Sequence, residues 1–515
     1  MSVLVLSVFG KILQADVEEK RMKKEQRAKE TGKTLRELPP PGLKVLEALA
    51  ATGIRSIRYA KELEGPTGVR HIVANDLDPT AVEHIRRNVE HNGVPPGRIE
   101  VSNEDACRHM YTRRARNAGG VGDDAYDVID LDPYGTVSPF LDAAVQAIAD
   151  GGLLCITSTD MPILGGNNPE TCFARYGGAA IKSSYVHEMA LRLVLHATSS
   201  AAAKYGREVR PLLSVSIDFY VRIFVRVFDS PARAKYQASK TGLVHQCVQC
   251  ESFFVQPLGD TEGEASAPKF KAARVVTPGS DCPECGNRMK LAGPFYIGPM
   301  YDQSFVSSCL EACETGAAGD LPGITSWKKI KGLLTAISQE LDFVLYYRLP
   351  QLCKGLKLEP VPLRQFRGTL AALGHRVSHF HREPEAIKTD APNAVIYDLM
   401  RLWAEEHPPK KQELLEKILK KELTLKRPIE WVSEEEVARK DKVPRFLPNP
   451  ERNWGPRARA KGGAAPDDAE AATVTPVLAA LGDAAPNAAE AKVAAVTPVT
   501  AAAEDTAVTG GVAEP

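Results

Sequence analysis

The sequence lacks several features that would assign it to a class at once. It has no run of about 18 apolar residues, so a membrane span is not expected. The opening MSVLVLSVFG has neither a basic lead nor a small-residue cleavage site, which argues against a secretory signal. Ten cysteines in 515 residues are too few for a disulfide scaffold, which favours a reducing compartment.

The chain also has no net charge, because it contains 65 basic and 65 acidic residues. The charge is nevertheless distributed unevenly along the sequence. Residues 461–515 hold two basic and eight acidic residues, so the rest of the chain has six more basic than acidic residues. That mild excess is compatible with a phosphate-bearing partner but does not identify one. The tail itself has no aromatic residue and is rich in Ala, Val, Thr, Pro and Gly, which predicts disorder.

What the sequence does have is an alternation of short apolar segments and helix-forming segments between residues 44 and 158. This order is typical of βαβ units and predicts a parallel, doubly wound sheet. A long helical stretch predicted from Gly178 to Tyr205 precedes two further β-rich segments, and Arg222 and Arg226 alternate with apolar residues in the second. We therefore predict an α/β fold with a Rossmann-like class I methyltransferase sheet, in which an antiparallel pair closes five parallel strands.

Three regions are predicted along the chain. Residues 1–234 form the α/β domain, and residues 235–460 form a second, α+β domain that contains two cysteine pairs. Residues 461–515 are the disordered tail. The charged segment 16–38 predicts an inserted surface helix.

The loop after the first predicted strand is built from small residues. Gly53 follows several alanines and opens a helix, which lets a ligand approach the backbone, although a full G-x-G-x-x-G pattern is absent. The second strand ends at Asp76, where a carboxylate commonly holds ribose hydroxyls; the alternative role is capping the next helix, for which Asp78 competes. After the third strand, Asp105 and the N–H of Ala106 can flank an adenine. Together, and without a phosphate-binding loop, these positions favour S-adenosylmethionine over a dinucleotide.

The fourth predicted strand ends in YDVIDLDPYG, which places Asp130, Asp132 and Tyr134 on alternate positions. An amino group on a purine is a poor nucleophile because its lone pair is delocalised into the ring. Asp132 and the carbonyl of Pro133 can accept its N–H groups, and Asp132 can also take the proton that is lost. Tyr134 can stack on the base, a contact worth about 1–3 kcal/mol. The alternative is a simple strand-ending turn, since Asp, Pro and Gly all form turns.

Several blocks of the sequence closely resemble the tRNA guanine-26 N2-dimethyltransferase family, in one order from Ser2 to about Ala460. They include NDLDPTAVEHIRRNVEHN, DVIDLDPYGTVSPFLDAAVQAI, GGLLCITSTDM, YGGAAIKSSYVHEMALRLVLH and RFLPNPERNWGPRAR. The resemblance implies an enzyme that transfers one or two methyl groups from S-adenosylmethionine to the guanine amino nitrogen in tRNA. It implies that Asp132 is the catalytic aspartate. The residues that it assigns to the cofactor are Arg55, Asp76, Asp105 and Ala106.

Members of that family carry a further segment before this sheet, with a Phe-Tyr-Asn-Pro-like stretch and an Asn-Arg-Asp whose arginine helps to hold the cofactor. The present sequence starts at MSVLVLSVFG, which resembles the helix that follows this segment. We therefore expect that the segment is absent from this sequence, either because the gene model is truncated or because this is a genuinely short, impaired form.

Two cysteine pairs, Cys247-x2-Cys250 and Cys282-x2-Cys285, are separated by 31 residues. This spacing lets four thiolates bind one tetrahedral Zn²⁺, and a site with four thiolates has no open position, so the ion is structural. The alternatives are two disulfides or a chance arrangement. Gly286, directly after the second pair, is expected to expose backbone N–H groups to sulfur. The family resemblance agrees with zinc.

The basic stretches Lys328–Lys331 and Lys410–Arg427 are each expected to be solvated faces. Together with Phe366, Tyr397 and Trp403 they predict a tRNA-binding surface, which grips RNA through shape and phosphates. The enzyme would have to flip the target base out of its stack. We expect tRNA as the partner, no membrane and no obligate protein partner, and a nuclear or cytoplasmic location with an organelle as the alternative.

Two other functions stay open at this point. The same chemistry can act on an adenine or cytosine amine, or on a ribosomal guanine. A non-catalytic tRNA-binding protein that has lost its cofactor clamp is the second alternative.

Overall fold

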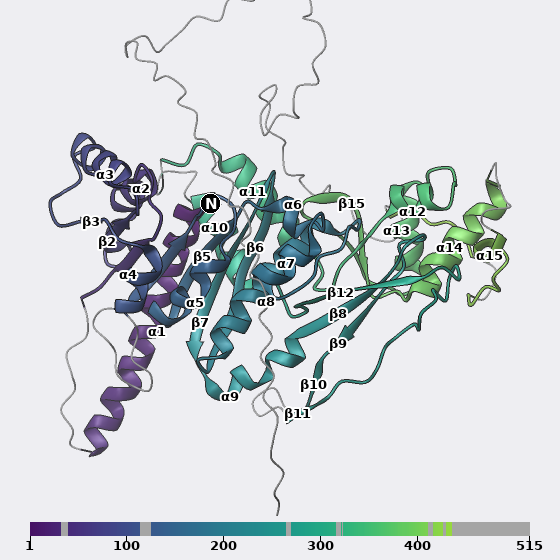
Figure 1. Cartoon of the computed structure of the whole chain (residues 1–515), viewed down its shortest axis with the longest axis horizontal. Helices are drawn as coiled ribbons and strands as arrows, with labels where there is room; N and C mark the ends of the chain where they lie inside the picture. The colour runs from purple at the N-terminus through teal and green to yellow at the C-terminus, as the bar shows by residue number, and fades with distance from the viewer. Residues whose placement is uncertain are drawn as a thin grey trace, which may run out of the picture. The chain divides into compact units, whose positions relative to one another are not determined.

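The computed structural model describes most of the chain before residue 435, as Figure 1 shows. All of these residues belong to one compact unit, Met1–Gly455. The predicted tail, the stretch RFLPNPERNWGPRAR and parts of Lys410–Arg427 lie outside the described residues. The described ranges are 1–31, 40–113, 125–263, 269–315, 321, 323–409, 416–425 and 429–434.

Seven of the described strands form one mixed sheet, in the order β3-β2-β1-β4-β5-β7-β6. The first five strands of this order pair in parallel, whereas β7 runs antiparallel to both β5 and β6. An α/β fold with five parallel strands and a closing antiparallel pair is therefore confirmed. The strands are β1 Leu43–Glu47, β2 Val69–Asn75, β3 Ile99–Ser102, β4 Tyr126–Leu131, β5 Ile148–Ser158, β6 Arg207–Ile217 and β7 Tyr220–Asp229.

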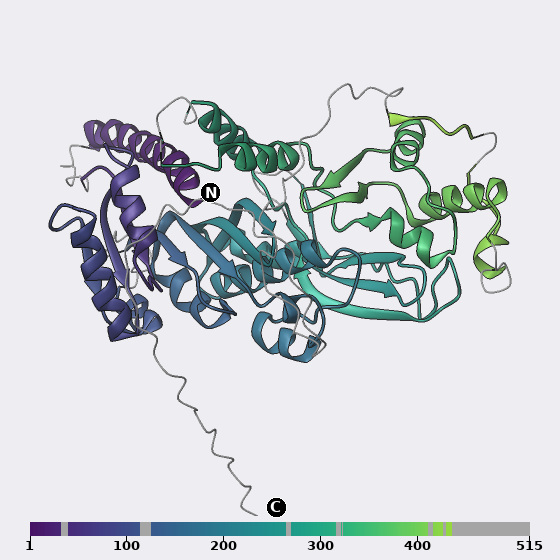
Figure 2. The ribbon, with the colours of Figure 1, turned by 90° about the horizontal axis from the view of Figure 1, so that it is seen from above.

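Helices cover the sheet in two packed groups. α1 packs against α2 and α10, whereas α5 packs against α4 and α8. Figure 2 shows α1, in purple, on the same side of the sheet as the green helical segment that contains α10 (Gln303–Thr315) and α11 (Trp327–Ser338). The helices of this region are α1 Ser2–Thr31, α2 Ile54–Glu62, α3 Pro79–His91, α4 Ala106–Thr112, α5 Ser138–Ala147, α6 Met161–Leu164, α7 Pro169–Tyr176, α8 Val186–Ala203 and α9 Pro231–Ala234, followed by the 3₁₀ helix η1 Lys235–Lys240.

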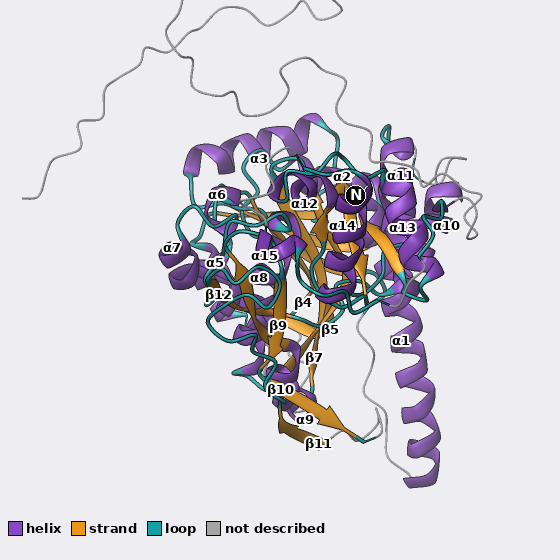
Figure 3. Cartoon of the chain, turned by 90° about the vertical axis from the view of Figure 1, so that its right-hand side faces the viewer, coloured by secondary structure: helices purple, strands orange, loops and turns teal. Residues whose placement is uncertain are grey.

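The first helix differs from the prediction. α1 runs without a break from Ser2 to Thr31, so the charged segment from residue 16 continues the apolar opening instead of forming a separate inserted helix. Its first turns are buried in the core, with Leu4, Val5 and Leu6 fully covered, and the charged part extends beyond the sheet, as Figure 3 shows. Across the described residues, no helix combines the length and the apolar character that a membrane crossing requires.

The helical stretch predicted from Gly178 also starts later than expected, at Val186. Ala179 instead pairs with Gly293 in an isolated bridge, with backbone hydrogen bonds of 3.0 and 2.9 Å in the two directions. Ala179 therefore uses its backbone N–H and C=O to bind Gly293, and these groups are not engaged in a helix. Contacts with a distant strand therefore override the local helix preference.

The remainder of the described chain contains two three-stranded sheets and a set of helices. One sheet has the order β12-β8-β9, the other β13-β15-β14, and β10 pairs with β11. The strands are β8 Thr241–Cys247, β9 Phe253–Pro257, β10 Gly259–Glu262, β11 Lys269–Ala272, β12 Met289–Tyr296, β13 Tyr347–Arg348, β14 Val377–Phe380 and β15 Glu383–Thr389. The helices are α10 Gln303–Thr315, α11 Trp327–Ser338, α12 Leu349–Gly355, α13 Leu363–Ala372, α14 Asn393–Glu406 and α15 Glu416–Leu419.

A buried ion network joins α8 to this second part of the chain. Glu188 accepts from Arg192 on the same helix at 2.8 Å and from Lys388 on β15 at 2.9 Å. All three side chains are at most 1% exposed, so each charge depends on its partners. The network fixes contacts between the two parts, and the domain boundary at residue 235 stays a prediction.

Candidate active site and metal centre

The carboxyl ends of β1 and β4 meet where the strand order reverses. β1 continues to β2 on one side, and β4 continues to β5 on the other. In open α/β sheets, ligands bind outside the carboxyl ends at such a switch point. The register pairs Glu47 with Asp130, so the loops after β1 and β4 leave the sheet side by side. The residues predicted for the cofactor and the base follow β1, β2, β3 and β4 at this edge.

The loop after β1 is held by the carboxylate that follows β2. Asp76 Oδ2 accepts from the Ala51 N–H at 2.7 Å, and its Oδ1 accepts from the Asp78 N–H at 3.0 Å. Asp78 in turn accepts from the Thr80 N–H at 2.9 Å and caps α3. The helix-capping role therefore belongs to Asp78. Asp76 is left beside the loop that contains Gly53, whose φ of 71° is in the left-handed region that favours glycine.

Asp105 and Ala106 lie at the start of α4. Asp105 Oδ1 accepts from the Arg108 N–H at 2.8 Å and caps the helix. The Asp105 side chain is exposed, so its second oxygen can still reach a ligand. Ala106 is the first helical residue, and its N–H is one that helix geometry leaves without an intrahelical acceptor. The role of both residues in holding an adenine stays a prediction.

Sequence reasoning missed two residues at the end of β2. Asn75 is 1% exposed and donates to the carbonyls of Ala48 and Glu104 at 3.1 and 3.0 Å, which joins the loops after β1 and β3. Leu77 is 68% exposed and offers an apolar surface to a flat ligand next to Asp76. Two features of the sequence could have indicated them: Asn75 ends an apolar strand, and Leu77 lies within a polar turn.

The reacting edge presents a carboxylate and an aromatic ring. β4 ends before Pro133, which has no N–H to continue the ladder. The Asp132 side chain is 31% exposed, and Tyr134 is 99% exposed. Gly135 has a φ of 90°, and its N–H donates to Thr159 Oγ1 at 2.8 Å, which anchors the bend to the end of β5. The bend therefore holds Tyr134 at the surface beside Asp132.

Asp132 belongs to a cluster of charges that extends below the surface. Arg55 contacts Asp132 through Nη2 and donates to Asp130 through Nη1 at 3.1 Å. Burial alone would raise the pKa of Asp130, but the guanidinium groups of Arg222 and Arg55 outweigh burial and lower it. Burial likewise opposes the charge of Arg55, and the nearby carboxylates, led by Asp130, outweigh it and raise the pKa of Arg55. Asp130 and Arg55 therefore both stay ionised.

A further buried carboxylate, Glu47, pairs with Asp130 across neighbouring strands. The Ser56 N–H donates to Glu47 Oε2 at 2.9 Å. Burial raises the pKa of Glu47 to about 8, and the charge of Asp130 acts in the same direction. Glu47 is thus mostly protonated below pH 8 and adds little charge to the cluster there.

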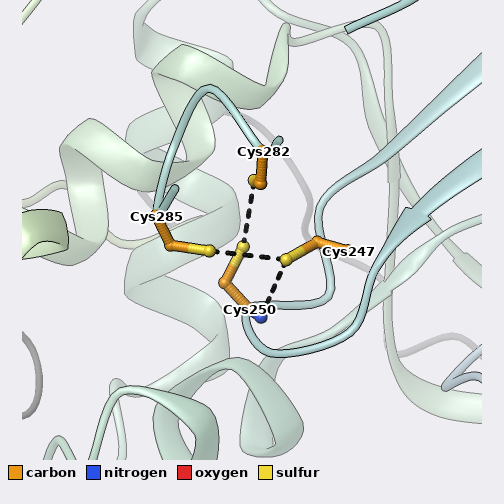
Figure 4. A group of neighbouring side chains, drawn as sticks. All are labelled: Cys247, Cys250, Cys282 and Cys285. Atoms are coloured by element: carbon orange, nitrogen blue, oxygen red, sulfur yellow. Dashed lines mark hydrogen bonds between the residues drawn. The ribbon is translucent and has the colours of Figure 1, made fainter. Parts of the chain in front are cut away.

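The four predicted metal ligands come together in one buried group, drawn in Figure 4. The sulfur atoms of Cys247, Cys250, Cys282 and Cys285 all lie within 4.8 Å of one another, with 3.4 Å from Cys247 to Cys285 and 3.6 Å from Cys250 to Cys282. Four thiolates at about 2.3 Å around a tetrahedral ion are separated by about 3.8 Å, so the donor set fits such an ion. The four residues could hold a metal.

Donors around the cysteines partly differ from the prediction. The N–H of Gly286 donates to the Cys282 carbonyl at 2.8 Å, so the predicted contact of this group with sulfur is wrong. The sulfur of Cys282 instead accepts from the Glu284 N–H at 3.4 Å, and that of Cys285 from the Asn287 side chain at 3.4 Å. The glycine closes a turn, and its neighbours donate to the sulfur atoms.

Ion pairs and a hydrogen bond tie the four-cysteine cluster to the helices that follow it. Glu284, between the second pair of cysteines, forms ion pairs with Arg401 of α14 at 2.6 Å and with Lys421 at 3.1 Å. Tyr397, also on α14, donates to the carbonyl of Cys250. The cysteines therefore belong to the same buried cluster as α12, α13 and α14.

The aromatic residues predicted for an RNA surface are buried. Phe366 and Tyr397 are fully covered and Trp403 is 8% exposed, so the expectation that these three rings contribute to a tRNA-binding surface is wrong. They fill the hydrophobic cluster around the cysteines. Their helices turn the aromatic rings toward this cluster, an orientation that the basic stretches elsewhere in the region do not reveal.

The sheet order and the carboxylate-proline-tyrosine edge define an α/β fold of the kind found in methyltransferases. A family model described as N2,N2-dimethylguanosine tRNA methyltransferase matches residues 1–401, and the chain belongs to this family. The chain is also similar to a solved structure of Trm1 from Pyrococcus horikoshii with S-adenosyl-L-methionine. That likeness has a TM-score of 0.57 and 27% sequence identity, and it covers 69% of this chain and 87% of the other.

Curated relatives agree with the family. A tRNA (guanine(26)-N(2))-dimethyltransferase of Drosophila melanogaster is 39% identical over 89% of this chain and 82% of its own length. The Homo sapiens protein of the same description is 45% identical over 84% of this chain and 65% of its own length. The chain thus spans about two thirds of the human relative.

Proposed function

We propose that this chain transfers methyl groups from S-adenosylmethionine to the N2 atom of guanine 26 in tRNA, which gives N2-methylguanosine and N2,N2-dimethylguanosine. One observation carries the proposal. Asp132 and the exposed Tyr134 lie two positions apart at the switch point of the sheet, next to the loops predicted for the cofactor. Membership of the family and the names of the relatives support the same reaction.

Five residues are proposed to hold the cofactor, which supplies an electrophilic methyl group on a sulfonium. The carboxylate of Asp76 suits the ribose hydroxyls, and the exposed Leu77 beside it suits one face of the adenine. The carboxylates at this edge also favour the positive charge of a sulfonium. The proposed cofactor residues are Gly53, Arg55, Asp76, Asp105 and Ala106.

Asp132, Pro133 and Tyr134 are proposed to receive the base. Tyr134 stacks on the guanine, and Asp132 and the Pro133 carbonyl accept the two N–H groups, which directs the nitrogen lone pair toward the methyl carbon. As the nitrogen–carbon bond forms, the sulfur–carbon bond breaks and the nitrogen loses a proton, which Asp132 can take. The exposure of Tyr134 fits a partner that arrives from solution.

For the metal centre we propose a structural Zn²⁺ on Cys247, Cys250, Cys282 and Cys285. All four side chains are at most 4% exposed, and four thiolates leave no position for substrate. The ion would join the end of β8 and the turn after it to the turn before β12. We further propose that residues 1–234 bind the cofactor and that residues 235–460 contribute to tRNA binding.

The location stays a proposal as well. A nuclear or cytoplasmic setting fits the free cysteines, and a mitochondrial setting is the alternative because a Saccharomyces cerevisiae relative is described as mitochondrial.

Methylation of tRNA transcripts by the purified full chain tests the function. We expect a primer-extension stop at G26, because a doubly methylated amine cannot pair, and no stop on a matched transcript with adenine at position 26. Asp132→Asn should lower the rate by about 10²–10⁴-fold, since it removes the charged acceptor. Equal methylation of the two transcripts, or an unchanged rate in the Asp132 variant, would contradict the proposal.

A further inference from the structure

Asp130 lies on β4, two positions before Asp132, and is 1% exposed. Its carboxylate accepts from Arg55 Nη1 at 3.1 Å, from the Tyr59 hydroxyl at 2.7 Å and from Arg222 Nη2 at 2.9 and 3.1 Å. A carboxylate has about four acceptor positions, and these four hydrogen bonds fill them. Asp130 is therefore not placed to contact a substrate. Its carboxylate instead fixes the side chains of Arg55, Tyr59 and Arg222.

Arg222 reaches Asp130 from a distant part of the sheet. It lies on β7, which is separated from β4 by β5, and it pairs in register with Thr157 of β5. Arg222 Nη1 donates to Thr157, and Nη2 reaches across to Asp130. Taking an arginine into an internal strand costs desolvation free energy, so a carboxylate partner is required to keep it there.

The guanidinium of Arg55 binds two carboxylates, the buried one of Asp130 and the partly exposed one of Asp132. Nη1 binds Asp130 and Nη2 binds Asp132 Oδ2, which leaves Oδ1 of Asp132 to receive an amino group. Arg222 supplies a second cation to Asp130 from the opposite side, so two cations balance two carboxylates. Without Arg222, Asp130 would draw Arg55 toward itself and away from Asp132, because a buried carboxylate is poorly solvated.

We propose that Arg222 and Asp130 are a positioning pair for methyl transfer: they fix Arg55 and, through it, the orientation in which Asp132 accepts the amino group of the base. The proposal rests on the proposed function. Arg222 and Asp130 touch neither the base nor the cofactor in this scheme. Their effect is transmitted through the hydrogen bonds of Arg55.

The double variant Asp130→Asn/Arg222→Gln tests the pair. It removes both charges and keeps the net charge, so no unpaired ion is buried; Asn has the shape of Asp, whereas Gln is shorter than Arg, a difference that the control variant below shares. We expect the single-turnover rate of methyl transfer, at saturating cofactor, to fall by about 10- to 100-fold, because small displacements of a catalytic group cost up to about that much. The affinity for tRNA, measured by filter binding, should not change. Arg222→Lys keeps the charge and should restore part of the rate.

A matched pair on the same strand supplies the control. Arg226 of β7 binds Asp16 of α1 at 2.6 Å and does not contact Asp132. Asp16→Asn/Arg226→Gln should therefore keep the wild-type rate. The proposal is overturned if the Asp130/Arg222 variant is as fast as wild type, or if both double variants are slowed equally. Should the Asp130/Arg222 variant fail to fold, the single variant Arg222→Gln decides, because it removes the second cation from Asp130: a wild-type rate in that folded variant overturns the proposal.

The two proposals fail in different ways. A wild-type chain that leaves G26 unmethylated contradicts the proposed function. Methylation that needs Asp132 but is indifferent to Asp130 and Arg222 contradicts only the positioning pair.

Discussion

The sheet edge and the cysteine centre are built alike but differ in access. Each gathers its functional groups from loops at strand ends, yet Tyr134 and Leu77 are 99% and 68% exposed, whereas the four cysteines are at most 4% exposed. Groups that meet a ligand which arrives and leaves must stay accessible. Groups that hold a permanent ion can be sealed by the core. The comparison implies that variants at the edge should affect activity, and variants at the centre should affect folding.

The largest expected effect comes from opening the cysteine centre. Cys282→Ser removes one of four ligands and should release the metal. Because binding free energy at a structural site is folding free energy, the region around α12–α14 should lose its protection from proteolysis. A strong chelator should do the same to the wild-type chain. Metal content by mass spectrometry and limited proteolysis measure both results.

A buried cysteine without a ligand role provides the control for this variant. Cys353 is 3% exposed in the same hydrophobic cluster, so Cys353→Ala creates a small cavity but should keep the full metal content. If Cys282→Ser retains both the metal and the proteolytic resistance, the cysteines do not form a structural centre.

How far the sequence predicts these two regions depends on the distance between partners along the chain. Alternating apolar segments were sufficient to predict the parallel strands, and the two C-x-x-C pairs were sufficient to predict that the four cysteines come together. Asp130 and Arg222 are 92 positions apart, and the residues next to either one do not indicate that the two form an ion pair. Glu284 and Arg401 lie 117 positions apart and were missed for the same reason. Local patterns identify elements, whereas buried ion pairs depend on how those elements pack.

At the edge, Tyr134→Ala should lower kcat/KM for tRNA without lowering the melting temperature, because the ring is 99% exposed and supports no core. Loss of a base–aromatic stack costs about 1–3 kcal/mol, or roughly one to two orders of magnitude. Tyr134→Phe keeps the ring and should stay close to wild type. A Phe variant as slow as the Ala variant would assign the effect to the hydroxyl instead of to stacking.

The smallest effect concerns two glutamates that are equally buried, at 4% exposure each, but in opposite surroundings. Burial raises the pKa of Glu47 from 4.5 to about 8. Burial also acts to raise the pKa of Glu340, but Lys388 and His381 outweigh it and lower the value to about 2. Glu47 is therefore stable in the fold as a neutral acid, and Glu340 as an anion.

These opposite shifts give opposite pH dependences of stability. Between pH 4.5 and about 8 the unfolded chain ionises Glu47 while the fold keeps it protonated, so its contribution to stability is lost as pH rises. Glu47→Gln removes this loss, and its melting temperature relative to wild type should rise by a few degrees from pH 5 to pH 8. The contribution of Glu340 is present above pH 4.5 and is lost as pH falls toward about 2, so Glu340→Gln should be destabilised throughout pH 5–8. Thermal melts of the three proteins across this range measure the difference, and parallel curves for Glu47→Gln and wild type would show that Glu47 is ionised in the fold.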